Sequence, residues 1–175
     1  GGFADKYSDQ VKSLSFIAPA GFGKAQTSIP FLMKIPGVIE WAMHVLADRF
    51  YGSAISSETT HSNDPLSINE EEFQQLFSFQ MQFKGFRESL ASTMRNFNLF
   101  DAREMFEKVA AKNIPSIAIW GDNDGIVSYK GAETYSEIFQ KGKVITIEGG
   151  THDITYRQPS DVLEAIKIFL DPQIS

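Results

Sequence analysis

Short apolar segments that alternate with amphipathic ones constrain the fold of this chain more than any other feature of its sequence. Residues 13–18, 116–120 and 143–147 are mostly apolar runs of strand length, and each is closely followed by a glycine-containing turn. Helical patterns lie around these runs at residues 3–9, 102–112, 130–139 and 159–170. Apolar strands separated by helices are typical of a parallel sheet covered on both faces. The sequence therefore predicts an α/β fold with three parallel strands.

The composition fits a globular protein with a sizeable core. The 175 residues are 42% hydrophobic and 22% charged, which excludes collagen-like, coiled-coil and wholly disordered chains. The sequence has no cysteine, so disulfides, thiolate metal sites and a cysteine nucleophile are all excluded for this chain. A chain without cysteine is compatible with a reducing compartment, which gives the cytoplasm a slight preference and otherwise leaves the location open.

The charge pattern argues against nucleic acid and membrane as partners. Acidic residues outnumber basic ones by 22 to 16, the net charge is −6, and no run of five Lys or Arg residues occurs. The longest mostly apolar stretch, residues 29–45, is interrupted by Lys34, Pro36 and Glu40, so membrane association is not indicated. The first residues show no signal-peptide pattern.

The middle of the chain, residues 22–100, has a different, helical character. A helix is predicted from Pro36, and a polar loop follows over residues 51–64. Two overlapping capping boxes, at 67–70 and at 69–72, could each begin the next helix. The apolar side chains of this helix and of another over 86–97 include Phe73, Leu76, Phe77, Met81, Phe83, Phe86, Leu90, Met94 and Phe97. Helix packing explains such a stripe more simply than a cofactor site does, and a substrate pocket is the alternative explanation.

Acid–base chemistry is suggested at the ends of two successive strands. Residues 121–124 (Gly-Asp-Asn-Asp) follow one strand, and residues 149–152 (Gly-Gly-Thr-His) follow the next. Ligands of open α/β sheets bind beyond the carboxyl ends of the strands. Asp124 alone is typical of a turn, and His152 alone of a structural loop histidine. Together they favour a pair in which the carboxylate fixes the histidine tautomer for proton transfer.

Three segments of the chain resemble enzymes of the α/β-hydrolase fold. Residues 114–127 (IPSIAIWGDNDGIV) closely resemble the segment that bears the triad acid, and residues 148–152, with the helix after them, resemble the histidine segment. Residues 11–20 resemble the strand that follows the nucleophile helix. The order of acid before histidine is also that of this family. The resemblance implies that Asp124, in preference to Asp122, is the acid and that His152 is the base.

The nucleophile of such a triad is absent from this chain. Gly1-Gly2 resembles the end of the Gly-x-Ser-x-Gly elbow, which implies a nucleophile two positions before Gly1; an added Gly-Gly sequence is the alternative. The oxyanion donors would also lie upstream, so the chain alone is expected to be inactive. The resemblance divides the chain into the start of the core at 1–21, a helical cap at 22–100 and the C-terminal core at 101–175.

The resemblance implies a serine hydrolase that cleaves carboxylic ester or similar acyl bonds, as esterases and lipases do. No metal or organic cofactor is implied, and His44 and His61 lack the spacing of metal ligands. The expected partner is a small molecule with an apolar portion, in a pocket lined by Phe22, Phe77, Met81 and Ile126.

Alternative functions remain open on the same fold. An upstream Asp nucleophile would imply an epoxide hydrolase or a haloalkane dehalogenase, and carbon–carbon bond hydrolases form a further branch. Dehalogenases and carbon–carbon bond hydrolases often carry an aromatic residue after the histidine, where this chain has Asp153. A non-catalytic binding protein and an inactive fragment are the alternatives of another class.

Overall fold

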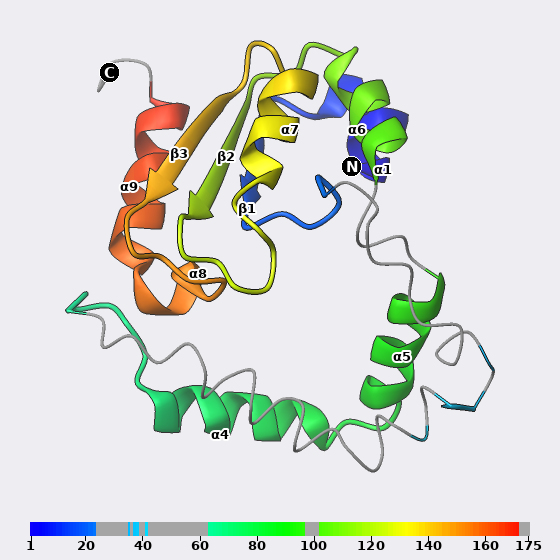
Figure 1. Cartoon of the computed structure of the whole chain (residues 1–175), viewed down its shortest axis with the longest axis vertical. Helices are drawn as coiled ribbons and strands as arrows, with labels where there is room; N and C mark the ends of the chain where they lie inside the picture. Colours follow the sequence, from blue (N-terminus) through cyan, green and yellow to red (C-terminus); the bar gives the residue numbers. More distant parts are fainter. Residues whose placement is uncertain (24–34, 36, 39–40, 42–62, 97–101, 172–175) are drawn as a thin grey trace. The chain divides into compact units, whose positions relative to one another are not determined.

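The computed structural model describes residues 1–23, 35, 37–38, 41, 63–96 and 102–171. The chain forms two compact units (Figure 1). The first, here called the core unit, comprises Gly1–Lys24, Ser62–Ser67 and Phe100–Ser175, and the second, the helical unit, comprises Ala25–His61 and Ile68–Leu99.

A three-stranded parallel sheet forms the centre of the core unit. Its strands are β1 (Leu14–Ile17), β2 (Ser116–Gly121) and β3 (Lys143–Ile147), in the order β1-β2-β3. In the register, Ala118 lies between Phe16 of β1 and Val144 of β3. Every residue of β2 is buried, because this strand is flanked by a strand on each side and covered on both faces. The predicted α/β fold with three parallel strands is thereby confirmed.

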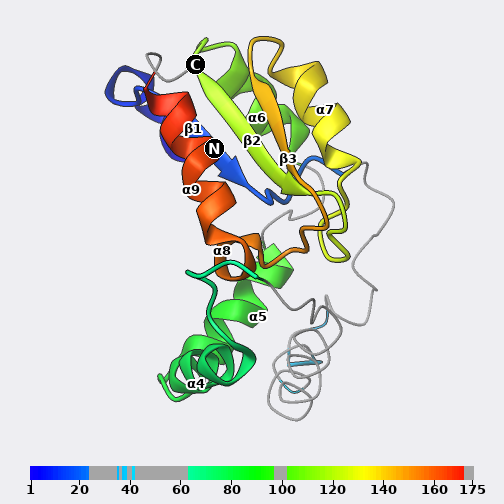
Figure 2. The ribbon, with the colours of Figure 1, turned by 90° about the vertical axis from the view of Figure 1, so that its left-hand side faces the viewer.

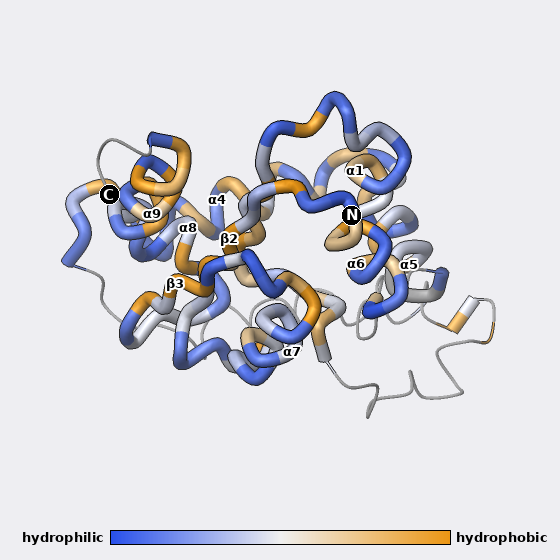
Figure 3. The backbone as a smooth tube through the Cα atoms, turned by 90° about the horizontal axis from the view of Figure 1, so that it is seen from above, coloured by the Kyte–Doolittle hydropathy of each residue, from blue (hydrophilic) through white to orange (hydrophobic). Residues whose placement is uncertain are grey.

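Helices cover both faces of the sheet (Figures 1 and 2). One face carries α1 (Gly2–Lys6), α6 (Arg103–Ala110) and α7 (Gly131–Ile138), whose buried side chains form one cluster with Ala118 and Trp120 of β2. Helix α1 packs against α6. The other face carries α8 (Ile154–Arg157) and α9 (Pro159–Leu170), which pack on Ile117 and Ile119. Alternate residues of β2 thus serve two separate clusters, as the pleat of a strand requires. Hydrophobic and hydrophilic residues recur in turn along α9, as in an amphipathic helix (Figure 3).

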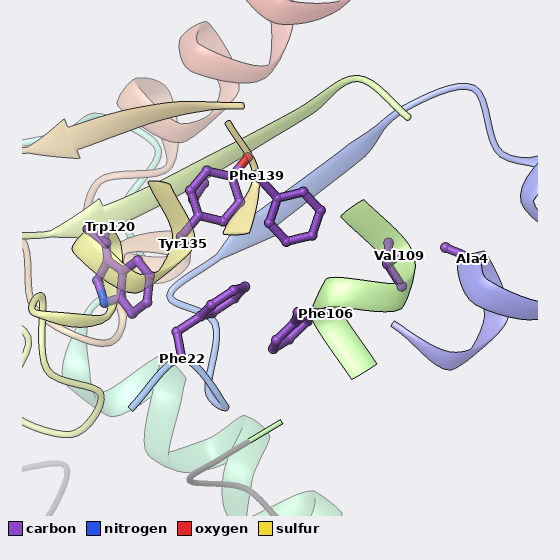
Figure 4. Packing of buried hydrophobic residues seen from close by; sticks show 9 residues of the cluster. Ala4, Phe22, Phe106, Val109, Trp120, Tyr135 and Phe139 are labelled. Atoms are coloured by element: carbon purple, nitrogen blue, oxygen red, sulfur yellow. The ribbon is translucent and has the colours of Figure 1, made fainter. Parts of the chain in front are cut away.

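Aromatic side chains fill the cluster between the sheet and α6 and α7 (Figure 4). Phe22 stacks on Phe106 with ring centroids 4.0 Å apart, and Tyr135 stacks on Phe139 at 4.9 Å. The polar atoms of this cluster are satisfied: the Tyr135 hydroxyl bonds the Ser116 hydroxyl at 2.8 Å, and burial raises the pKa of Tyr135. The indole N–H of Trp120 donates to the carbonyl of Val127 at 2.9 Å, which ties this core to the loop after β2.

Helix α9 takes its N-terminal cap from a residue 96 positions away. Asp64 accepts hydrogen bonds from the backbone N–H and the hydroxyl of Ser160, both at 2.8 Å. Partial removal from water acts to raise the pKa of Asp64, yet hydrogen bonds from Leu66 and Ser160 hold the pKa below its ordinary value. Ser62–Ser67 group with the core unit, and the division of the chain into a cap at 22–100 and a core on either side of it stays a prediction.

The described part of the helical unit contains α4 (Glu70–Met81) and α5 (Phe86–Asn96). Of the two possible capping boxes, the one at 69–72 forms: Glu72 N–H donates to Asn69 Oδ1 at 2.9 Å, and Asn69 N–H donates to Glu72 Oε2 at 3.0 Å. Most of the helix predicted from Pro36 and of the polar loop at 51–64 lies outside the described residues. Among the helices that the structure describes, none combines the length and the apolar character that a bilayer span needs.

Candidate active site

The loops after β2 and β3 meet at one end of the sheet. Because these strands are parallel neighbours, with Gly121 paired with Ile147, their carboxyl ends lie side by side. The first loop carries Asp122 and Asp124, and the second carries His152. This is the position at which open parallel sheets bind their ligands.

Asp124 and His152 form a hydrogen-bonded pair, with 3.0 Å between the carboxylate Oδ2 and the ring Nδ1. The Asp124 side chain is fully buried, and the His152 side chain is 34% exposed. The second oxygen, Oδ1, accepts the backbone N–H groups of Ile126 at 2.9 Å and Val127 at 2.7 Å. Both oxygens are thus fixed by donors, which holds the carboxylate in one orientation.

This geometry selects the tautomer of His152. An ionised carboxylate can only accept a hydrogen bond, so Nδ1 carries the proton in the pair with Asp124. The lone pair is then on Nε2, the ring nitrogen on the far side from the carboxylate. A half-exposed imidazole with a buried, oriented carboxylate behind it can take up and release a proton at Nε2.

Asp122, the competing acid in the sequence, has a different partner. Its Oδ1 accepts the backbone N–H of Gly149 at 2.7 Å, in the loop that leads to His152. Two backbone bonds run beside it, from Asp122 N–H to the Ile147 carbonyl at 3.3 Å and from Asn123 N–H to the Gly150 carbonyl at 2.9 Å. Asp122 therefore joins the two loops, a role that the sequence reasoning missed, because a turn aspartate carries no signal of a partner in a distant loop.

Gly121 and Gly150 allow the two loops to approach this closely. A Cβ atom on Gly121 would lie 2.1 Å from the Gly150 carbonyl oxygen, and one on Gly150 would lie 2.9 Å from Gly121 Cα. These obstacles are backbone atoms, which cannot move aside without shifting a loop. Glycine is required at both positions by the close approach of the loops.

We expect Gly121→Ala to destabilise the core unit by about 1–3 kcal/mol, because the added methyl group must displace the loop after β3, residues 148–153, here called the histidine loop. Thermal unfolding followed by circular dichroism measures this loss. Gly2→Ala is the matched control, since a Cβ there meets nothing within 4 Å and the residue begins a helix. Equal melting temperatures for the two variants would contradict the packing argument.

The other predicted site residues are scattered. Phe22 is 1% exposed and stacks on Phe106 in the aromatic cluster, and its assignment to a substrate pocket stays a prediction. Ile126 is 58% exposed and lies two residues after Asp124. Phe77 and Met81 are half-buried on α4 of the helical unit, and their assignment to a substrate pocket stays a prediction.

The structure describes the two N-terminal glycines but not the two remaining histidines. Gly1 precedes α1, and Gly2 is its first residue. His44 and His61 lie outside the described residues. Within the described ranges, no group of three or more His, Asp or Glu side chains is placed to hold a metal ion.

A groove of about 560 Å³ lies elsewhere on the core unit. Its lining includes Ser116, at the start of β2, and Gly142, immediately before β3. It therefore opens at the amino ends of the strands, on the opposite edge of the sheet from the Asp124–His152 pair.

The chain resembles a known lipase in sequence. It is 26% identical to Lipase 3 from Moraxella sp. (strain TA144), and the match covers 97% of the chain and 51% of that protein. The chain thus spans about half the length of this curated relative. No family model matches the chain.

Solved structures show the same arrangement of elements. A bromoperoxidase from Bacillus anthracis superposes with a TM-score of 0.63 at 20% identity, covering 97% of this chain and 63% of its own. A carboxylesterase from Bacillus subtilis gives 0.65 at 16% identity, with coverages of 96% and 54%. An esterase from Thermogutta terrifontis gives 0.61 at 18% identity, with coverages of 96% and 58%. With its parallel sheet and covering helices, the chain has the α/β-hydrolase fold and matches a C-terminal portion of that fold.

Proposed function

We propose that this chain supplies the acid and the histidine of a serine hydrolase that cleaves carboxylic ester or similar acyl bonds. The observation that carries the proposal is the 3.0 Å contact between Asp124 Oδ2 and His152 Nδ1 at adjacent strand ends. The Asp124 carboxylate is fully buried, and two backbone N–H groups fix its second oxygen. A histidine with a purely structural role does not require a partner held in this way. The names of the relatives, a lipase and two esterases, support an acyl substrate.

In the proposed reaction, Nε2 of His152 takes up a proton and then releases it, first as the acyl-enzyme forms and again as it is hydrolysed. Nε2 accepts the proton of the nucleophilic hydroxyl as its oxygen attacks the substrate carbonyl carbon. The resulting imidazolium donates that proton to the leaving alcohol, and an acyl-enzyme remains. Water, deprotonated in turn by Nε2, attacks the acyl carbon, and the imidazolium returns that proton to the nucleophile oxygen as the carboxylic acid leaves. Asp124 keeps Nδ1 protonated and stabilises the positively charged ring. Proton transfer by a positioned side chain of this kind contributes about 10²–10⁴-fold to a reaction rate.

The nucleophile and the oxyanion hole belong, in this proposal, to residues before Gly1. The pair Gly1-Gly2 is interpreted as the end of the nucleophile elbow, with the serine two positions upstream. The chain by itself is then expected to show no turnover, because an imidazole without a nucleophile and an oxyanion hole cannot form the acyl-enzyme. Ile126, exposed beside the acid, is proposed to contact the apolar portion of a small ester substrate.

A fluorophosphonate probe tests this proposal on the full-length protein. We expect the probe to modify one serine, which peptide mass spectrometry will place two residues before Gly1. A short-chain p-nitrophenyl ester should compete with the labelling, and His152→Ala should slow it strongly. The 175-residue chain is the matched control and should stay unlabelled.

Two other outcomes would overturn the serine assignment. A carboxylate ester trapped on an upstream aspartate would indicate an epoxide hydrolase or a dehalogenase. Absence of both labelling and ester turnover in the folded full-length protein would support a non-catalytic binding protein on this fold.

A further inference from the structure

Asp153 follows His152 directly and makes contacts in two directions. Its Oδ1 accepts a hydrogen bond from the Thr151 hydroxyl, and its Oδ2 accepts one from Arg157 Nε at 3.0 Å. The backbone carbonyl of Asp153 also accepts the N–H groups of Tyr156 at 2.8 Å and Arg157 at 3.0 Å, which begin α8. One residue thus links the position before His152 to the helix after it.

These contacts are partly withdrawn from solvent. Thr151 is buried, and the side chains of Arg157 and Asp153 are 13% and 24% exposed. A charge-assisted hydrogen bond that is shielded in this way is stronger than an ion pair in open solvent. The helix at the other end of the link is itself anchored, because Ile154 of α8 is fully buried among the residues that pack on β2.

The backbone around His152 is therefore fixed on both sides. Before the histidine, the Asn123–Gly150 backbone bond and the Asp122–Gly149 bond tie the loop to the loop after β2. After the histidine, the Asp153 carboxylate ties Thr151 to Arg157 and so to α8. The His152 side chain lies between these two attachments and is partly exposed. Its ring bonds the buried Asp124 carboxylate, whose orientation is fixed.

We propose that Asp153 is a positioning residue for His152: its carboxylate, bridging Thr151 and Arg157, holds the histidine loop so that the imidazole stays on Asp124. The catalytic consequence rests on the proposed function, whereas the effect on the Asp124–His152 contact does not. Displacement of a reacting group by about 1 Å can cost on the order of 10²-fold in rate, which sets the scale of the expected effect.

Two substitutions with opposite effects on charge test this role in the full-length protein. Asp153→Asn removes a negative charge beside His152 and keeps the side-chain shape, whereas Arg157→Gln removes a positive charge. Loss of positioning should lower kcat in both variants, by about 10–100-fold, with KM for a short-chain ester nearly unchanged. A purely electrostatic influence on His152 would change the activity in opposite directions. The double variant should lose little more than either single one, because both remove the same link.

Nuclear magnetic resonance supplies a readout that does not depend on activity. The His152 Nδ1 proton in the bond to Asp124 should give a downfield signal, and we expect both variants to weaken or broaden it. Asp161→Asn, at an exposed position in the first turn of α9, is the matched control and should keep both kcat and the signal. Melting temperatures identify any variant that fails to fold.

The outcomes separate this inference from the proposed function. Normal kcat and a normal Nδ1–H signal in both variants would overturn the positioning role, even if His152→Ala is inactive. Full activity of His152→Ala would overturn the proposed function, and a weakened signal in the Asp153 and Arg157 variants would still support the positioning of His152.

Discussion

Replacing His152 by alanine in the full-length protein should lower kcat for ester hydrolysis by about 10⁴–10⁶-fold. The imidazole is the group that faces solvent from the Asp124–His152 pair, so its loss removes the proton acceptor and leaves Asp124 with no partner to orient. Steady-state kinetics with a p-nitrophenyl ester, together with a melting curve, measures this effect separately from folding.

The matched control for this variant is Glu71→Ala. Glu71 lies in the exposed first turn of α4, distant in sequence from both members of the pair, and should leave kcat unchanged. A His152→Ala variant that hydrolyses esters within a few fold of the unmodified protein would remove His152 from the mechanism.

The second large effect is expected for Asp124→Asn, at about 10²–10⁴-fold in kcat with little change in KM. Two backbone N–H groups, of Ile126 and Val127, face Oδ1, so the amide oxygen of asparagine should remain there. The amide NH₂ then faces His152 Nδ1 and donates to it. The proton of the neutral ring moves to Nε2, and the histidine cannot act as a base.

Asp122→Asn provides the comparison, because an amide oxygen can still accept the Gly149 N–H. We expect this variant to retain far more activity than Asp124→Asn. Equal losses in the two variants would contradict the assignment of Asp124 as the acid. The His152 Nδ1–H signal should disappear in Asp124→Asn and persist in Asp122→Asn, which reports the tautomer of His152 directly.

The strands and the acid–histidine pair could be found from the sequence because their signals are local. The strand at 143–147 has the predicted bounds, since a mostly apolar run there is followed by Glu148 and a pair of glycines. Asp124 and His152 could be paired because the topology of a parallel sheet brings the ends of successive strands together. The capping box at Asn69 was likewise visible as a spacing of three residues, although only the structure decided between two overlapping candidates.

The contacts that sequence reasoning missed left no signal in a local sequence pattern. The hydrogen bond that caps the N-terminus of α9 comes from Asp64, 96 residues before Ser160, and no local pattern connects the two. The four-residue helix α8 is too short to show a period, so the link from Asp153 to Arg157 had no signal. The stacking of Phe22 on Phe106 had no signal either, because an aromatic residue in the sequence is equally compatible with a core and with a binding site.

The sequence by itself determined the class of fold and named Asp124 and His152 as the candidate acid–histidine pair, because strand pattern, turn glycines and chain order are properties of neighbouring residues. The resemblance favoured Asp124 over Asp122 as the partner of His152, but only the tertiary structure decided what each carboxylate contacts. Asp122 and Asp124 differ by two positions in one turn, but the first bonds the Gly149 backbone and the second is buried against the ring. That choice depends on the close approach of Gly121 and Gly150, a packing constraint between two loops that no local pattern expresses.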